Sequence, residues 1–408
     1  MNPAILAAKQ KNARRILDYI IKCGETSRVN IAAALNLSTA TVTNIINDLL
    51  AANLVYEGRQ DNAPVGRKAT FIHFNEKLYY IIAVSLSNIG NISLSVCSLL
   101  GEPINSKEYY IDLYVNESNT ITMVLKSIID TVSSFIESQE EDIKSKLCAV
   151  ALSIPGMVNK KQIVNAPSQN WKNMNLASPL QAATKLPVYL ENVTRIKAIY
   201  EMRYINPEDK NVIYITLSPG IGIVNFFDGK MIMGRNGIAG EAGHMTLNLH
   251  GVECYCGNRG CFECYCGEIN ILKKAEKLLE KDNRCNILFD LVENKHMPLT
   301  MNTLFEARNL GSLKVHELLS EAGEYLGAGL VSLFNCFDPD KIIISGAPVE
   351  GDSFLLDVAV EEAKSRIISK FSRDFNIQIA TLKTEELHKG ICAFVLNKLL
   401  DKFVLQIM

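Results

Sequence analysis

The residues best suited to chemistry in this chain are cysteines and a histidine crowded between positions 244 and 266. The chain has 408 residues and eleven cysteines, and five of these cysteines fall between residues 254 and 266. Three thiolates and one imidazole form a donor set typical of tetrahedral Zn²⁺, and Gly257 and Gly260 allow the backbone to curl between the donors. The sequence therefore predicts a zinc site, with ordinary buried cysteines as the alternative. The predicted ligands are His244, Cys254, Cys256 and Cys261.

Two further cysteines, Cys264 and Cys266, follow the predicted ligands directly. They are either spare thiols on the next helix or alternative ligands, and we interpret them as spare thiols.

The chain shows no N-terminal targeting pattern and no apolar run of about 18 residues. The sequence therefore predicts a cytoplasmic protein without a membrane span, in which cysteines stay reduced or bind metal.

The first 75 residues contain three stretches with helical spacing of apolar residues. The first covers residues 13–21 and ends at Gly24, and the second covers residues 28–35. Ser38 is placed to cap a third helix. The apolar stripe of that helix is spaced i, i+3, i+4, i+7 and i+8, and it consists of Val42, Ile45, Ile46, Leu49 and Leu50.

The opposite face of the third helix carries short polar side chains, which let a helix approach base edges in the major groove of DNA. Residues 54–57 and 70–74 predict a two-stranded hairpin with a basic tip. This order of elements predicts a winged helix-turn-helix that binds DNA, and a small three-helix domain with a solvated polar face is the alternative. The candidate DNA-contacting residues are Arg28, Ser38, Thr39, Thr41, Thr43, Asn44, Asn47, Arg67 and Lys68.

The distribution of charge agrees with this interpretation. Residues 1–75 hold nine Lys and Arg against five acidic residues, which gives a net charge of +4, whereas the remainder of the chain carries −6. A basic segment on an acidic body is expected when one end of a protein meets phosphate. The whole chain, at −2, is not a basic nucleic-acid binder.

From about residue 78 short apolar strands alternate with helical stretches, which predicts an α/β body. The predicted strands are Tyr80–Leu86, Ile92–Cys97, Leu147–Ser153, Val188–Leu190, Val212–Thr216 and Lys341–Ser345.

Several motifs in this body resemble the ROK family, and in particular its repressor branch of N-acetylglucosamine and xylose repressors. Residues 240–263 read GEAGHMTLNLHGVECYCGNRGCFE and match the family's GH…CxCGxxGCxE signature position for position. Residues 153–156 (SIPG), 165–167 (NAP), 191–192 (EN), 220–222 (GIG) and 322–347 are similar to other family segments.

The resemblance implies an actin/hexokinase-like body of two α/β lobes with a sugar cleft between them, and an association into homodimers or tetramers. The expected domains are the winged helix-turn-helix at residues 1–75, lobe 1 at residues 76–190 joined by the C-terminal helix 389–408, and lobe 2 with the zinc site at residues 191–388.

The resemblance also indicates that kinase chemistry has been lost. ROK kinases begin with DxGGT, whose acid, two glycines and threonine match Ser85, Ser87, Asn88 and Ile89 here. The second loop, usually GTGxG, reads SPGIG at residues 218–222, and Pro219 has no N–H to donate to a phosphate. The catalytic base is the Asp of the family's END triplet, and Val193 stands in its place. A valine cannot accept a proton, so the sequence predicts that the protein is not an enzyme.

Family positions that hydrogen-bond sugar hydroxyls match five residues of this chain. Carboxylates suit this role because an ionised group accepts several hydroxyl donors, and the histidine could use one ring nitrogen for zinc and the other for sugar. A sugar hydroxyl left without a partner against Val193 would cost about 1–3 kcal/mol. Three alternatives follow: the ligand lacks that hydroxyl, carries it in modified form, or binds in a different position. The first alternative favours a pentose such as xylose over glucose or N-acetylglucosamine. The predicted sugar-binding residues are Gly156, Asn192, Glu241, His244 and Glu263.

Taken together, the sequence predicts a sugar-responsive transcriptional repressor that binds operator DNA and controls carbohydrate-utilisation genes. Two alternatives remain open: a ROK sugar kinase with a DNA-binding head, and a repressor controlled by a protein partner. Loss of effector binding is also compatible with the sequence.

Overall fold

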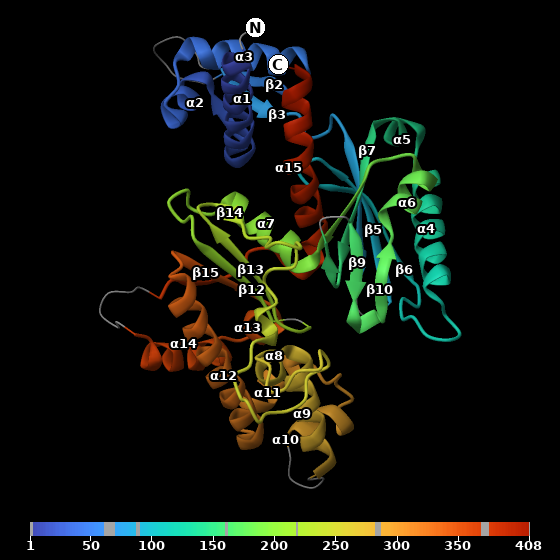
Figure 1. Cartoon of the computed structure of the whole chain (residues 1–408), viewed down its shortest axis with the longest axis vertical. Helices are drawn as coiled ribbons and strands as arrows, with labels where there is room; N and C mark the ends of the chain where they lie inside the picture. The colour runs from blue at the N-terminus through green and yellow to red at the C-terminus, as the bar shows by residue number, and fades with distance from the viewer. Residues whose placement is uncertain are drawn as a thin grey trace. The chain divides into compact units, whose positions relative to one another are not determined.

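The computed structural model describes residues 3–60, 70–86, 90–159, 162–217, 219–281, 287–368 and 375–407. The chain forms two compact units (Figure 1). Unit 1 contains residues 1–204 and 382–408, and unit 2 contains residues 205–381. Within the described ranges no helix is long and apolar enough to cross a bilayer.

Unit 1 begins with the three predicted helices, α1 (Pro3–Cys23), α2 (Arg28–Leu35) and α3 (Thr39–Ala51). Helix α1 starts well before the apolar stretch that predicted it. The tight turn between α2 and α3 places Asn36 in the left-handed region at φ 51°, which asparagine tolerates. The Ser38 side chain accepts a hydrogen bond from the Thr41 backbone N–H at 3.1 Å, so the predicted cap of α3 is confirmed.

The predicted hairpin is also present. Strands β2 (Val55–Gln60) and β3 (Thr70–Phe74) pair antiparallel, and β1 (Glu25–Ser27) adds a third strand on the far side of β3. The sequence did not predict β1. The wing residues Arg67 and Lys68 lie outside the described residues.

A five-stranded sheet, ordered β11-β7-β4-β5-β6, forms the centre of the rest of unit 1. Its strands are β4 (Tyr80–Leu86), β5 (Asn91–Ser98), β6 (Pro103–Tyr110), β7 (Leu147–Ile154) and β11 (Val188–Asn192). The first three form an antiparallel meander, and β7 and β11 join β4 in parallel. Alternating residues face opposite sides of the sheet, so Ile82 and Val84 contribute to one core cluster while Ile81 and Ala83 contribute to another.

Helices cover both faces of this sheet. The cluster with Ile82 includes residues of α4 (Ile121–Glu137) and α6 (Ala177–Thr184). The cluster with Ile81 includes residues of α7 (Val193–Tyr204), α15 (Leu387–Ile407) and the winged helix. Helix α15, drawn red in Figure 1, contacts both β4 and α1. The DNA-binding head and the body of unit 1 therefore share one continuous apolar core.

Unit 2 is built on a second five-stranded sheet, ordered β14-β13-β12-β15-β16. Its strands are β12 (Val212–Thr216), β13 (Gly222–Phe227), β14 (Lys230–Met231), β15 (Lys341–Ser345) and β16 (Ile377–Ile379). Strand β12 pairs antiparallel with β13 and parallel with β15. The main helices are α8 (Glu263–Cys266), α9 (Glu268–Lys281), α11 (Met301–Asn309), α12 (Leu313–Phe337) and α14 (Phe354–Arg366).

All six strands predicted from the sequence are present, three with identical bounds and three extended by one or two residues. The remaining elements are short. They are α5 (Glu141–Lys146), β8 (Met157–Val158), β9 (Ile163–Ala166), β10 (Trp171–Asn175), α10 (Ile287–Phe289), a π-helical turn (Asp290–Asn294), α13 (Ala347–Glu350) and 3₁₀ turns at Pro167–Gln169, Ala242–His244 and Thr384–Glu386.

Candidate functional site: a thiol–imidazole cluster and a DNA-binding helix

The four predicted metal ligands come together in unit 2. Their donor atoms all lie within 4.8 Å of one another. Cys254 Sγ lies 3.6 Å from His244 Nδ1, and Cys256 Sγ lies 3.8 Å from Cys261 Sγ. The side chains that form this His/Cys cluster are His244, Cys254, Cys256 and Cys261.

Tight backbone turns produce the cluster. The Cys254 N–H donates to the Asn258 carbonyl at 2.8 Å, which folds the segment into a hairpin with Cys256 at its tip. Gly257 and Gly260 have φ of 90° and 64°, a region that side chains with a Cβ avoid. A Cβ at Gly260 would also approach the Asn248 carbonyl oxygen to 1.7 Å. The predicted role of both glycines is confirmed.

The pKa values of Cys256 and Cys261 are shifted in opposite directions. Burial raises the pKa of Cys261 to about 12, and the neighbouring Cys256 adds to that effect. For Cys256, burial acts in the same direction, but the Asn258 backbone N–H and the Cys254 and Cys261 thiols lower the pKa overall. Cys256 is thus the thiol that ionises most readily of the two, and ionised sulfur is the form that binds a metal.

Neither Cys264 nor Cys266 belongs to the cluster of donor atoms found among the described residues. Both are buried on α8, and the Cys266 thiol donates to the Phe262 carbonyl at 3.7 Å. This agrees with their interpretation as spare thiols.

The second nitrogen of His244 faces a residue that the sequence analysis did not single out. His244 Nε2 lies 3.3 Å from the Tyr255 hydroxyl, and the two rings meet edge to face at 5.3 Å. The Tyr255 side chain is 69% exposed as a whole. Partial burial, followed by the negative charge of Glu263, raises the pKa of the Tyr255 hydroxyl. Tyr255 occupies a variable position of the CxCG signature, so the motif carried no signal for it.

Two of the predicted sugar-binding residues lie together in unit 1. The Asn192 side-chain N–H donates to the Gly156 carbonyl at 2.8 Å. The Asn192 side-chain oxygen accepts the backbone N–H groups of Thr194 at 2.9 Å and Arg195 at 3.2 Å. Asn192 therefore caps helix α7, a role that the sequence analysis did not predict.

The other three predicted sugar-binding residues, Glu241, His244 and Glu263, lie in unit 2. Glu263 is only 6% exposed, and its carboxylate accepts the Ile221 backbone N–H at 2.8 Å. A Cβ at Gly220 would come within 2.2 Å of the same carboxylate oxygen. Glu263 thus connects the His/Cys cluster to the loop at residues 219–222.

The sequence resemblance matches that loop to a phosphate-binding segment of kinases, and backbone carbonyl groups at and just before the loop face the start of helix α9. The Glu268 N–H donates to the Leu217 carbonyl and the Ile269 N–H to the Pro219 carbonyl, both at 3.1 Å. Free N–H groups at a helix start are what binds a phosphate, and these two are already engaged. Ser218, like residues 87–89 of the first loop, lies outside the described residues.

The predicted DNA-contacting residues differ in their availability. On α3, Thr39, Asn44 and Asn47 are exposed, whereas Thr41 and Thr43 are half-buried. Ser38 is engaged as the helix cap, and its hydroxyl also lies 2.8 Å from that of Thr41. The Arg28 guanidinium donates to Glu57 at 2.8 Å, so any contact with DNA would have to share or break this ion pair.

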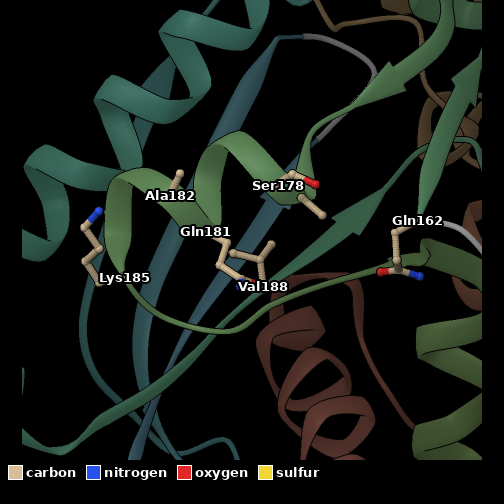
Figure 2. A pocket seen from close by; sticks show the side chains of 7 residues that line it. Gln162, Ser178, Gln181, Ala182, Lys185 and Val188 are labelled. Atoms are coloured by element: carbon tan, nitrogen blue, oxygen red, sulfur yellow. The ribbon is translucent and has the colours of Figure 1, made fainter.

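A hollow of about 600 Å³ in unit 1 is separate from all of these residues. It lies between α6 and the start of β11, and Figure 2 shows Ser178, Gln181 and Ala182 projecting from that helix. Among the described residues that line it, Lys185 is the charged one. None of the predicted site residues lines this hollow, so we do not assign it to the site.

Comparison with known proteins agrees with this architecture. Residues 100–398 match the model of the ROK family, and residues 9–56 match a model of a winged helix-turn-helix DNA-binding domain. The chain belongs to the ROK family.

One relative is the xylose repressor of Bacillus spizizenii, which is 27% identical over 96% of this chain and 97% of the relative. Another is the DNA-binding transcriptional dual regulator NagC of Escherichia coli, which is 26% identical over 98% of this chain and 95% of the relative. A solved ROK family transcriptional regulator, a homolog of the E. coli MLC protein, has a TM-score of 0.78 at 24% identity over 98% of both chains. A ROK glucokinase from Streptomyces griseus, solved with glucose and AMPPNP, covers 78% of this chain and 99% of its own length with a TM-score of 0.65 at 23% identity.

Proposed function

We propose that this protein is a sugar-responsive transcriptional repressor, in which the winged helix binds operator DNA and the ROK body senses a sugar without phosphorylating it. One observation carries this proposal. A winged helix-turn-helix shares its core with a ROK body whose catalytic-base position is Val193, and that side chain packs against the same apolar cluster. The names of two relatives that match over nearly their whole length, a xylose repressor and a DNA-binding transcriptional dual regulator, support it.

Two further features favour sensing over catalysis. Phosphoryl transfer needs a base for the sugar hydroxyl and a cradle for the nucleotide phosphates. The base is replaced by Val193, and the first N–H groups of α9 bond to the Leu217 and Pro219 carbonyls. We therefore expect no ADP release in the presence of any sugar.

We assign Zn²⁺ to the His/Cys cluster. Tetrahedral zinc with Zn–S bonds of about 2.3 Å and Zn–N bonds of about 2.0 Å requires sulfurs about 3.8 Å apart and a sulfur and nitrogen about 3.5 Å apart. The Cys256–Cys261 and Cys254–His244 separations, 3.8 and 3.6 Å, match these values, and all four donor atoms lie within 4.8 Å of one another. The donor set therefore fits the ion. Bound zinc would stabilise the thiolates and fix the turn that carries Tyr255 and Glu263.

Within unit 2, we propose that the sugar is recognised by Glu241, Glu263 and Tyr255, with His244 acting through the Tyr255 hydroxyl. His244 Nδ1 points toward the thiols, and Nε2 is satisfied by the Tyr255 hydroxyl. The Tyr255 hydroxyl would thus contact the sugar at the point where the sequence analysis expected the second ring nitrogen of His244. Separately, Gly156 and Asn192 in unit 1 stay proposed as sugar-binding residues.

The apolar Val193 favours a pentose as the effector. A hydroxyl buried against this side chain would lose a hydrogen bond, at a cost of about 1–3 kcal/mol. Xylose lacks the hydroxymethyl group of glucose and N-acetylglucosamine, and the name of one relative includes xylose. Tight binding of glucose or N-acetylglucosamine with no response to xylose would refute this part.

We further propose a homodimer or tetramer whose winged helices bind two half-sites of a palindromic operator. This proposal keeps three domains: a DNA-binding domain at residues 1–75, lobe 1 at 76–190 with the C-terminal helix 389–408, and lobe 2 at 191–388. It also keeps a cytoplasmic location.

The experiment that tests the function begins with selection of binding sequences from a random duplex DNA library. Fluorescence anisotropy then measures the Kd for the selected duplex with xylose, glucose or N-acetylglucosamine. We expect one sugar to change this Kd by roughly 5- to 150-fold. Glu241→Gln should reduce the response, whereas Glu276→Gln on the exposed face of α9 should not. No selected sequence, or ADP release with any sugar, would overturn the proposal.

A further inference from the structure

The DNA-binding head is attached to the body by a polar contact between α1 and the C-terminal helix α15. The Arg14 guanidinium donates to the Asn397 backbone carbonyl at 3.0 Å and to the Asp401 carboxylate. Its Nε donates to Asp18 on α1 itself at 2.9 Å. Arg14 therefore holds one helix of the head against one helix of the body over a sequence separation of 383 residues.

A second guanidinium reaches the same point from another helix. Arg203, at the end of α7, donates to the Ala393 carbonyl at 3.1 Å and to the Asn397 side-chain oxygen at 3.2 Å. Arg14 also lies 3.4 Å from that oxygen. One amide oxygen thus accepts from two cationic side chains on two different helices, and burial lowers the pKa of Arg203. The three-helix contact formed by Arg14, Arg203 and Asn397 is called the Asn397 joint below.

Helix α7 links the Asn397 joint to a predicted sugar-binding residue. The helix begins directly after Asn192, whose side-chain oxygen accepts the N–H groups of its second and third residues at 2.9 and 3.2 Å. A helix of twelve residues is about 18 Å long and moves as a rigid element. A change in the position of Asn192 is therefore carried to Arg203 at the other end.

Close packing makes α15 respond to α7 along this length. A Cβ at Gly390 of α15 would meet Ile196 Cγ2 of α7 at 3.0 Å, so the two helices approach as closely as a glycine permits. Ile196 and Leu396 belong to the apolar cluster that also contains Ile16 and Ile20 of α1. Packed cores of this kind tend to switch between discrete arrangements rather than deform continuously.

We propose that the Asn397 joint transmits sugar occupancy at Asn192 to the DNA-binding head, through movement of α7. This inference rests on the proposed function. The sugar favours one position of α7, Arg203 then shifts its hold on Asn397, and Arg14 changes the orientation of α1. The coupling arises only from the difference in sugar affinity between the two arrangements.

The test uses the full chain, its selected operator duplex and xylose, glucose and N-acetylglucosamine as probes. Asn397→Leu keeps the size of the side chain and removes its hydrogen-bonding groups. Gln406→Leu makes a matched amide-to-leucine change at an exposed position of the same helix. We expect Asn397→Leu to bind sugar and operator like the wild type, while the ratio of operator Kd values with and without sugar falls to about 1. Gln406→Leu should keep the wild-type ratio.

The outcomes separate the joint from the function. A wild-type protein whose operator affinity ignores every sugar refutes the proposed function. A wild type that responds, together with an Asn397→Leu variant that responds equally, refutes the joint. If circular dichroism shows that Asn397→Leu is unfolded, Arg203→Met tests the same contact from α7 and retains most of the aliphatic stem. An unchanged ratio in a folded Arg203→Met variant would also overturn the inference.

Discussion

The contact between Gly220 and Glu263 allows a quantitative prediction about unit 2. A methyl group at position 220 would lie 2.2 Å from the Glu263 Oε2 and 2.8 Å from its carboxyl carbon. Because Glu263 is 6% exposed and accepts the Ile221 N–H at 2.8 Å, Gly220→Ala must displace the carboxylate and break this bond. A hydrogen bond to a charged group contributes about 1.5–3 kcal/mol.

Hydrogen exchange is the suitable assay, because a chain of two units is not expected to unfold in a single two-state transition. The predicted loss corresponds to a roughly 10- to 150-fold faster exchange of amides around Ile221 in Gly220→Ala. Peptides from the sheet of unit 1 provide the internal control.

A double-mutant cycle isolates the cause. Glu263→Ala removes the atoms that the new methyl group would meet, and it speeds exchange at Ile221 because that N–H loses its acceptor. In this background Gly220→Ala should add less than about a twofold further change. Equal acceleration by Gly220→Ala in both backgrounds would mean that Glu263 does not hold the loop, and the reasoning would be wrong.

Four further predictions follow from single contacts. Cys256→Ser should lose zinc by elemental analysis and lose the sugar response, yet still bind operator DNA; unaltered zinc content would contradict the ligand assignment. Tyr255→Phe should keep zinc and bind sugar roughly 2- to 10-fold more weakly by calorimetry, whereas unchanged or tighter binding would place its hydroxyl outside the sugar site. Ser38→Ala removes the α3 cap and should cost about 0.5–2 kcal/mol, seen as faster exchange in α3 and not in α4. Burial and then Lys389 lower the pKa of His388 below 6.5. As the pH falls, the unfolded chain therefore binds the proton first, and the stability of the folded protein decreases below about pH 6.5. His388→Gln should flatten the fall in Tm between pH 7.5 and 5.5, and a slope equal to that of the wild type would contradict this.

The predicted convergence of His244, Cys254, Cys256 and Cys261 shows where sequence reasoning succeeds. The four donors lie within eighteen residues, and Gly257 and Gly260 have the positive φ that the short turns require. When ligands are this close in sequence, their spacing and the glycines between them leave few ways to arrange the chain. The same holds for the cap Ser38 and for the strands with unbroken apolar runs, because both depend on neighbours within a few residues.

Residue types alone did not reveal how predicted site residues are used. Asn192 was expected to bind sugar, and its oxygen caps α7. Glu263 was expected to bind sugar, and its carboxylate holds the Ile221 N–H across 42 residues of sequence. Tyr255 has no role in the signature, but the turn places its hydroxyl against His244. A polar side chain can satisfy several partners, and which one it meets depends on the fold.

The sequence by itself determined the kinds of parts in this protein: a winged helix-turn-helix with its helix cap, a His/Cys cluster, and a ROK body. Each is encoded in a short segment, where local spacing and side-chain chemistry are sufficient. Only the tertiary structure decided how these parts are joined. Arg14 meets Asn397 across 383 residues and Arg203 meets it across 194, because strands, helices and a shared apolar core bring distant segments together in ways that no local pattern records.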